Sequence, residues 1–487
     1  MSKVVKKTNW VLLIYLTSIF MLAGIIIAVP NPPIILILPL IFAVIVLFIT
    51  HIELGFYFIV MTLPFQRLEM AIGTINVSPV DLVTWPWLLA YGIVILGRGI
   101  RNNKLHTIKL QNSKLLLFVA LWLLTTIISG VNVTNKTAFL FTVVSRAVYA
   151  MILLASYYEF SVHPWVLRPI TNLYIGVALV VALFGVLQLG GLIPNPLIDP
   201  FSGQLIGGGD RSRMASFLSN ANLLAGYLSV PFFFSWVQYR KSLGRRRHIY
   251  LAIFVALLVS LIFTFSRSGY LGIIAGAIVL YIVRSRENQR KRFIKCIVIA
   301  FTAIFLLALF IIVKSPMLQS TSNILSAMVA GDTQELDSSN QNRLMVWNMA
   351  IKMYKSSPLI GVGAGQFQVL FENYIPLKYS FLDAFNAHNT YLQILAETGI
   401  LGLTSFFALF GYIVLMVLKA SKKDPSTIEE MGGALAGLIT LVVIGLTHNM
   451  VKTEIWFIAG LVLAYSRQNQ NNKKDPKIHH GGERDHS

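Results

Sequence analysis

A histidine and a glutamate lie where a polar segment of the chain passes into a long apolar one. The segment reads Ala387-His388-Asn389-Thr390-Tyr391-Leu392-Gln393-Ile394-Leu395-Ala396-Glu397-Thr398-Gly399. An imidazole at the aqueous end of a helix can accept a proton from a hydroxyl group near neutral pH. Glu397 follows about two and a half helical turns later and is therefore expected deeper in the bundle. Spacing alone also allows the simpler interpretation, in which His388 caps the helix and Glu397 is an interior hydrogen-bonding residue.

Arginines form the second group of residues that could do chemistry. A guanidinium presents a planar fork of donors that fits phosphate oxygens, and it stays charged at any relevant pH. Several that converge would bind a diphosphate. Each one taken alone could equally be an interfacial residue whose head group reaches toward water. The arginines expected at the external membrane boundary are Arg67, Arg211, Arg213, Arg267 and Arg343.

Arg146 differs from these arginines because it falls well inside an apolar run. A charge at that depth costs at least a few kcal/mol on insertion scales. Arg146 is therefore expected to face the interior of a helix bundle and to have a partner, for which Asp81 is one candidate. A structural ion pair and a substrate contact both remain open for it.

The elements that must position these residues are membrane-spanning helices. The chain has 487 residues, of which 56% are hydrophobic and 12% charged, about half the charged fraction of a soluble domain. Continuously apolar runs exclude the alternating pattern of a membrane barrel. The predicted fold class is all-α, a polytopic membrane protein with about 12–14 transmembrane helices of about 20 residues each. The spans are expected near residues 11–29, 34–50, 54–65, 81–97, 115–130, 138–157, 170–190, 216–238, 249–265, 269–283, 293–313, 391–418, 430–447 and 453–465.

The formal net charge of +20 follows membrane topology and does not indicate a nucleic-acid partner. Lysines and arginines gather in short loops that an even number of helices places on one side, at 98–114, 240–247, 284–295 and 419–423, and in the tail from 467. The positive-inside rule assigns that side to the cytoplasm. We therefore expect a cell (plasma or inner) membrane protein with both termini cytoplasmic and with membrane lipids as partners.

The expected domains follow the runs of apolar residues. They are N-terminal helices in 1–190, central helices with arginine motifs in 191–313, an extracytoplasmic loop in 314–389, C-terminal helices in 390–466 and a polar tail in 467–487. No disulfide can form from the single cysteine, Cys296. We expect no metal ion, because phosphate enzymes that use magnesium bring paired carboxylates and the predicted outer surface offers none.

The long loop is predicted to contain an amphipathic helix that begins at Ser339 or Asn340. Its expected apolar face consists of Leu344, Trp347, Ile351 and Tyr354. The glycines of 361–365 are predicted to form a flexible turn. Without a preceding strand they do not indicate a dinucleotide site.

Four segments in the same order resemble the O-antigen ligase and polysaccharide polymerase superfamily. The histidine segment is one of them. The others are Arg213-Met214-Ala215-Ser216-Phe217 with Asn220-Ala221-Asn222-Leu223-Leu224-Ala225, then Thr264-Phe265-Ser266-Arg267-Ser268-Gly269, and Arg343 and Trp347 followed by Pro358, Gly361, Gly363, Gly365 and Phe367. The chain has Ala-Ser-Phe and Ala221 where members often carry Gly-Thr-Phe and proline.

The resemblance implies a metal-independent, membrane-embedded glycosyltransferase that inverts the anomeric carbon of a glycan carried on undecaprenyl diphosphate. It needs no cofactor. Its partners would be a lipid-diphosphate-linked glycan donor and a glycan acceptor, with a flippase and a chain-length regulator as further expected partners. His388 would take the acceptor proton and Arg213, Arg267 and Arg343 would bind the diphosphate, together with Arg67 and Arg211. Supporting roles fall to Glu397, Asn389, Asn222 and Arg146.

Within this resemblance we favour a polymerase of a cell-envelope polysaccharide, such as an anionic wall polymer of the teichuronic acid type, because the chain is basic and rich in lysine. A ligase that transfers a finished glycan to a lipopolysaccharide core or to a protein stays open. The rival from another class is a transporter or flippase of lipid-linked sugars. A transporter would be expected to show inverted repeats, and the sequence shows no internal symmetry. A purely structural subunit would have no need of His388.

Overall fold

The computed structural model describes residues 34–66, 68, 70–72, 75–101, 112–193, 197–198, 205–206, 213–218, 220–285, 338–374, 386–421, 427–450 and 452–471. Nearly all of these residues are helical, and the predicted all-α class is confirmed. The helices are α2 (Ile34–Thr50), α3 (Ile52–Thr62), α4 (Pro79–Arg101), α5 (Ser113–Ile128), α6 (Lys136–Val162), α7 (Leu167–Leu189), α8 (Ala221–Lys241), α9 (Gly244–Phe263), α10 (Arg267–Arg284), α13 (Ser338–Ser356), α14 (Phe367–Tyr374), α15 (Thr390–Ala420), α16 (Ile428–Ile444) and α17 (Thr453–Asn471).

Seven helical segments within the described residues are long and apolar enough to cross a membrane, which agrees with a polytopic membrane protein. They are Pro79–Gly97, Ser113–Asn132, Lys136–Val162, Pro164–Leu189, Gly244–Phe263, Arg267–Arg284 and Thr390–Ala420. The predicted spans 11–29 and 293–313 lie outside the described residues. Two short antiparallel hairpins join helices, β1 (Met70–Ile72) with β2 (Ile75–Val77) and β3 (Leu197–Ile198) with β4 (Leu205–Ile206).

Helices α8, α16 and α17 form the centre of the bundle, and their side chains are buried along most of their length. Close packing of α10 on α16 depends on small residues. A Cβ atom at Gly276 would lie 2.6 Å from the carbonyl oxygen of Ala436, and the hydroxyl of Thr440 donates to the carbonyl of Gly272 at 2.9 Å. Small residues at such crossings let helix backbones approach in a membrane, where lipid supplies no hydrophobic drive for association.

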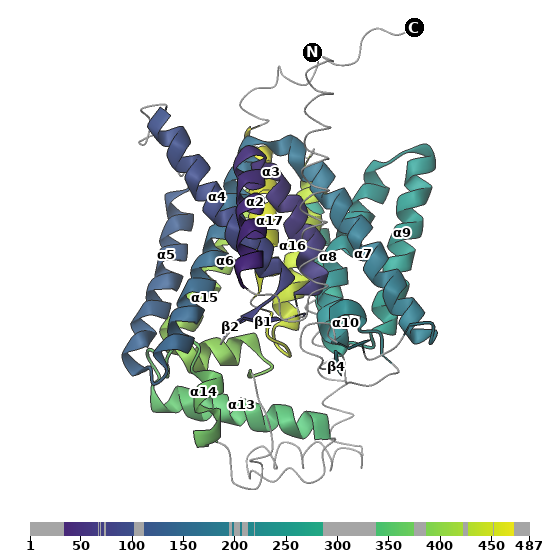
Figure 1. Cartoon of the computed structure of the whole chain (residues 1–487). Helices are drawn as coiled ribbons and strands as arrows, with labels where there is room; N and C mark the ends of the chain where they lie inside the picture. The colour runs from purple at the N-terminus through teal and green to yellow at the C-terminus, as the bar shows by residue number, and fades with distance from the viewer. Residues whose placement is uncertain are drawn as a thin grey trace, which may run out of the picture.

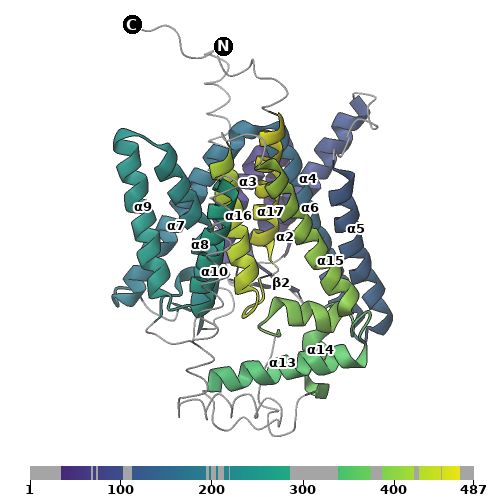
Figure 2. The ribbon, with the colours of Figure 1, turned by 180° about the vertical axis from the view of Figure 1, so that it is seen from behind.

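The helices run so that chemistry-bearing residues and basic loops occupy opposite ends of the bundle. The C-termini of α4, α8, α10 and α15 all lie on one side of the bundle (Figures 1 and 2). The N-termini of α8, α10 and α15 lie on the opposite side, and α13 and α14 lie across that side. The described parts of the basic loops therefore gather on one side, as the sequence predicts. Assignment of that side to the cytoplasm stays a prediction.

Helix α15 is broken at Gly399, which has φ 64° and ψ −166°. The segment 358–363 fills the break. The amides of Val362 and Gly363 donate to the carbonyls of Ala396 and Glu397 at 2.9 and 3.0 Å, and the amides of Ile400 and Leu401 donate to the carbonyls of Pro358 and Leu359 at 2.9 and 3.3 Å.

The predicted turn over 361–365 is therefore present, but bonds to α15 fix its backbone, contrary to the expected flexibility. Gly361 has φ 74°, and a Cβ atom there would lie 2.3 Å from the carbonyl carbon of Glu397. The glycine is needed for close backbone approach at a left-handed conformation.

The predicted helix of the long loop is confirmed as α13, but its buried face differs from the expected one. Val346, Met349, Ala350 and Met353 are buried in a cluster that includes residues of α14 and α15. Ile351, which the sequence assigned to the apolar face, is 38% exposed. Both stripes have helical spacing, and the contact with α15 decides between them.

Candidate active site

Asn222, near the start of α8, joins three segments that are far apart in the sequence. Its Oδ1 accepts from Nη2 of Arg213 at 3.2 Å and from Oγ of Ser266 at 2.6 Å. Its Nδ2 lies 3.1 Å from Nε2 of His448, in the loop between α16 and α17. Asn222 is buried, so the orientation of its amide matters for all three partners.

The contacts of Asn222 fix the tautomer of His448. A guanidinium can only donate hydrogen bonds, so the atom of Asn222 that faces Arg213 must be the carbonyl oxygen. The other atom is then the amide nitrogen, which donates to Nε2 of His448. His448 is therefore neutral and carries its proton on Nδ1, where Oγ1 of Thr447 lies at 3.1 Å. The ring is 3% exposed.

His388 lies beside this cluster at the start of α15. Its ring centroid is 6.3 Å from that of His448, and the two rings meet edge to face. Its backbone amide donates to Oδ1 of Asn386 at 2.9 Å. The helix is capped by Asn389, which accepts from the amides of Tyr391 and Leu392 at 3.0 and 3.1 Å. The simpler interpretation of His388 as the cap is therefore wrong.

Backbone strain coincides with the sequence motifs. Three non-glycine residues within the described ranges have positive φ: Ser216 (53°), Phe265 (47°) and His388 (46°). Each lies in a different motif segment, and such strain persists only where surrounding contacts enforce it. Ser216 is held by a bond from its hydroxyl to the carbonyl of Val181 at 2.8 Å. Strained conformations cluster at functional sites, which makes this end of the bundle the candidate site.

Two of the predicted arginines lie within electrostatic range of each other. Nε and Nη2 of Arg213 donate to the carbonyls of Thr264 and Phe265 at 3.0 and 3.2 Å, which holds the side chain in place. Burial lowers the pKa of the Arg343 guanidinium, and the like charge of Arg213 lowers it further. Among the described residues, no carboxylate pairs with either arginine. Two cations that act on each other electrostatically make this end of the bundle favourable for an anion.

Arg267 is the first residue of α10 and is exposed. It directly follows Ser266, which caps α10 through the amide of Gly269 at 3.1 Å. Helices α8, α10 and α15 all begin at this end with side-chain caps, so their partly positive N-termini add to the arginine charges. Arg67 and Arg211 lie outside the described residues.

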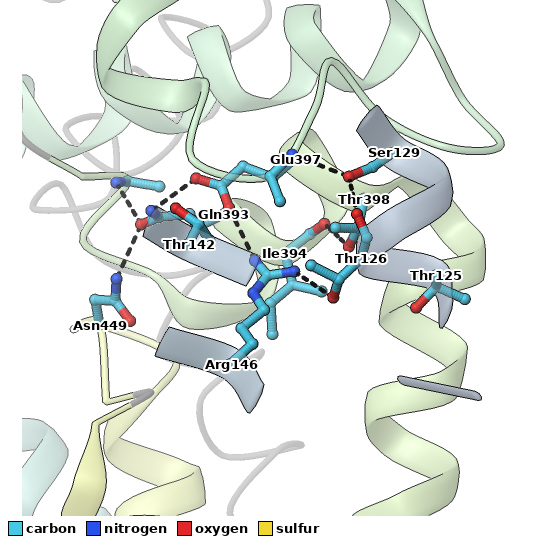
Figure 3. Close-up of polar contacts among 12 residues, drawn as sticks. Thr125, Thr126, Ser129, Thr142, Arg146, Gln393, Ile394, Glu397, Thr398 and Asn449 are labelled. Atoms are coloured by element: carbon cyan, nitrogen blue, oxygen red, sulfur yellow. Dashed lines mark hydrogen bonds and ion pairs between the residues drawn. The ribbon is translucent and has the colours of Figure 1, made fainter. Parts of the chain in front are cut away.

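Arg146 and Glu397 form a buried ion pair (Figure 3). Nη2 of Arg146 lies 2.9 Å from Oε2 of Glu397, and Nη1 donates to Oγ1 of Thr126 at 3.0 Å. Both ionised side chains are nearly fully buried. The expected burial and pairing of Arg146 are therefore found, but the candidate partner Asp81 is wrong. Asp81 instead accepts from the hydroxyl of Ser78 at 2.7 Å.

A polar chain connects this ion pair to the loop between α16 and α17. Nε2 of Gln393 donates to Oε1 of Glu397 at 3.1 Å, and Nδ2 of Asn449 donates to Oε1 of Gln393 at 3.1 Å (Figure 3). The hydroxyl of Thr390 donates to the carbonyl of His448 at 3.0 Å. The start of α15 and this loop are thus positioned together.

Sequence reasoning missed His448, Asn449 and Gln393. A signal was present, because His448 and Asn449 lie between two predicted spans on the external side of the predicted topology. A single histidine in a short loop is common, and its bond to Asn222 across the bundle could not be deduced from spacing. Within the described ranges, no group of three or more histidines, cysteines or carboxylates could hold a metal ion.

Residues 252–407 match the family model of the O-antigen ligase. The O-antigen ligase match covers about a third of the chain, from within α9 to within α15, and contains Arg267, Arg343, His388 and Glu397. It supports the resemblance drawn from the motifs and suggests membrane glycosyltransferase activity of the ligase or polymerase type. Arg213, Asn222 and His448 lie outside the match. Asn222 bonds to the other two, and His448 lies beside His388. No curated protein matches the chain.

Proposed function

We propose that the protein is an inverting glycosyltransferase that polymerises oligosaccharide repeat units linked to undecaprenyl diphosphate, on the outer face of the cell membrane. The observation that carries this proposal is the position of His388. Its strained backbone lies beside His448, which contacts Asn222 and, through it, Arg213. An imidazole and a fixed guanidinium at one end of a membrane bundle fit a lipid-diphosphate substrate.

The proposed reaction joins an acceptor hydroxyl to the anomeric carbon of the donor sugar. The acceptor oxygen attacks that carbon as the bond from the carbon to the diphosphate oxygen breaks, and the bonding electrons leave with the diphosphate. His388 accepts the hydroxyl proton. Attack from the face opposite the leaving group inverts the anomeric carbon.

The arginines act on the leaving group. Negative charge grows on the diphosphate oxygen as the bond breaks, so cations held near that oxygen stabilise the transition state more than the ground state. Arg213, Arg267 and Arg343 are proposed for this role, and Arg67 and Arg211 extend it. The contacts of Arg213 with Thr264, Phe265 and Asn222 pre-organise its guanidinium before substrate binds.

The buried pair of Arg146 and Glu397 is proposed to position side chains of the site. Glu397 positions Gln393 and, through it, the loop that carries His448 and Asn449. Asn389 orients the first turn of α15 by capping it.

The product is proposed to be a cell-envelope polysaccharide, with an anionic wall polymer of the teichuronic acid type as the specific candidate. The basic composition of the chain supports that candidate. A flippase that delivers the donor and a regulator of chain length would be its partners, and both termini would lie in the cytoplasm.

The test uses purified full-length protein in nanodiscs and a synthetic oligosaccharide on a polyprenyl diphosphate. A polymerase elongates this donor when it is supplied alone and releases carrier diphosphate, and EDTA leaves the rate unchanged. H388A should lower the rate by about a hundredfold or more. H163A is the matched control and should keep full activity. His163 directly follows α6, beside Glu159, at the end of the bundle opposite His388.

The remaining outcomes separate the alternatives. Product that forms only when a second, chemically different acceptor is added would identify a ligase. Carrier lipid that crosses the bilayer without any change in the glycan would identify a transporter. Equal rates for H388A and the native protein would remove the histidine from the mechanism.

A further inference from the structure

A groove between α7 and α9 lies at the end of the bundle opposite the candidate site. It encloses about 480 Å³. Helices α7 and α9 lie side by side in both views (Figures 1 and 2), and the hydroxyl of Tyr250 donates to Oδ1 of Asn172 at 3.2 Å across the groove. This groove shares no lining residue with the histidine and arginine cluster.

Each helix lines the groove with one face that is basic at one end and apolar along the rest. On α7 this face has Arg168 and Asn172, then Ile175, Gly176 and Leu179; on α9 it has Arg246, then Ile249, Tyr250 and Ile253. Arg168 is near the start of α7 and Arg246 near the start of α9. Both charges therefore lie at the same end of the groove.

The two arginines lack acidic partners within the described part of the chain, and both are exposed. Glu159, at the end of the neighbouring α6, pairs with His163 at 3.7 Å. Two cations at the mouth of an apolar groove match a ligand that combines an anionic head with a hydrocarbon chain. Arg240 and Arg245–Arg247 make this end of the bundle basic, which suits a membrane surface rich in anionic lipid.

The wall of the groove also has room for a chain. A Cβ atom added at Gly176 would meet nothing within 4 Å, so the middle of the α7 face is open. A larger residue at this helical position would occupy the groove itself.

We propose that this groove binds an anionic phospholipid, with the phosphate between Arg168 and Arg246 and an acyl chain along Ile175, Leu179, Ile249 and Ile253. The site is independent of the proposed transferase reaction. It would anchor α9, which leads directly into the turn that contains Phe265 and Ser266.

The test measures lipid retained by the full-length protein. Protein reconstituted with equal amounts of phosphatidylglycerol and phosphatidylcholine is extracted into mild detergent, and bound lipid is counted by native mass spectrometry. We expect one tightly held phosphatidylglycerol per chain. R168Q/R246Q should weaken its retention by about tenfold or more, from the loss of two charge-assisted contacts. R240Q/R245Q removes the same charge outside the groove and should retain the lipid.

A second variant tests the groove without changing any charge. G176L should displace the lipid, whereas G92L, which adds the same side chain at an open position on α4, should not. Retention of phosphatidylglycerol by both R168Q/R246Q and G176L would overturn the proposal, and so would equal loss in the two control variants. Glycosyl transfer is not the readout, so failure here and failure of the proposed reaction are separate results.

Discussion

The amide of Asn222 donates to Nε2 of His448 at 3.1 Å, although 226 residues separate the two in the chain. The same amide accepts from Arg213 and Ser266. The last described loop of the bundle therefore sets the orientation of a side chain that holds an arginine of the proposed diphosphate site. His448 acts as a positioning residue in this arrangement.

The effect of a His448 substitution on activity should depend on whether the new side chain accepts a hydrogen bond from Asn222. H448Q offers a carbonyl oxygen to Asn222 and should keep activity within about threefold of the native rate. H448L leaves the buried amide without its acceptor, at a cost of about 1–3 kcal/mol, and should raise the KM for the donor about tenfold or more as Arg213 shifts. Titration of the donor with each variant measures the difference in KM between them. Equal kinetics for the two variants would show that the bond has no functional role.

Replacement of Arg213 or Arg343 by lysine should weaken donor binding although it conserves charge. An ammonium cannot reproduce the fork of the guanidinium, and one lost charge-assisted bond corresponds to about 1.5–3 kcal/mol, or about 10–100-fold in kcat/KM. R245K, at the opposite end of the bundle, is the control and should be neutral. Normal kinetics in R213K and R343K would favour the interpretation of both as interfacial residues.

The buried pair of Arg146 and Glu397 should be more sensitive to loss of one partner than to loss of both. R146M or E397Q leaves an uncompensated buried charge and should destabilise the protein by about 3–5 kcal/mol. R146M/E397M removes both charges and should recover most of that loss. Thermal unfolding in detergent measures stability, and the transfer assay separates structure from function. A stable but inactive double variant would show that the pair serves the reaction and not only the fold, as the proposed positioning of Gln393 requires.

The substitution G399A should lower the stability of the protein, because it introduces strain at the break in α15. The backbone has φ 64°, and a Cβ atom would lie 2.3 Å from the carbonyl oxygen of Leu359. Strain of this kind costs about 1–3 kcal/mol, and the clash adds to it. G411A is the matched control in the same helix, because a Cβ atom there meets nothing within 4 Å. A Tm for G399A equal to that of G411A would contradict this account of the break.

The helices of the bundle were predictable because their signal is local. Apolar runs of helical length predict α4 through α10 and α15 through α17 to within about six residues at either end, since lipid requires every spanning backbone to bond within its own segment. The same local signal fails for α13. Two stripes have helical spacing there, and the choice of Met349 over Ile351 depends on a contact with α15.

The partners of the polar residues were less predictable. The sequence requires a partner for Arg146, because a lone buried charge is too costly, but it does not distinguish Asp81 from Glu397. Both candidates have the right charge, and only the packing of α6 and α15 against their shared neighbours α5 and α17 brings Glu397 within 2.9 Å. For His448 the sequence does not require a partner, since a histidine in a loop can be solvated by water and need not contact another helix.

The break in α15 also bears on how the chain is made. Residues 358–363 are synthesised before residues 396–401, yet each segment supplies backbone groups that the other needs. A broken membrane helix is tolerated only where protein satisfies the freed groups. During biogenesis, α15 therefore cannot reach its final form as an autonomous inserted segment. Its insertion and the docking of the preceding segment must be completed together, which makes a contiguous stretch of about forty residues a single unit of assembly.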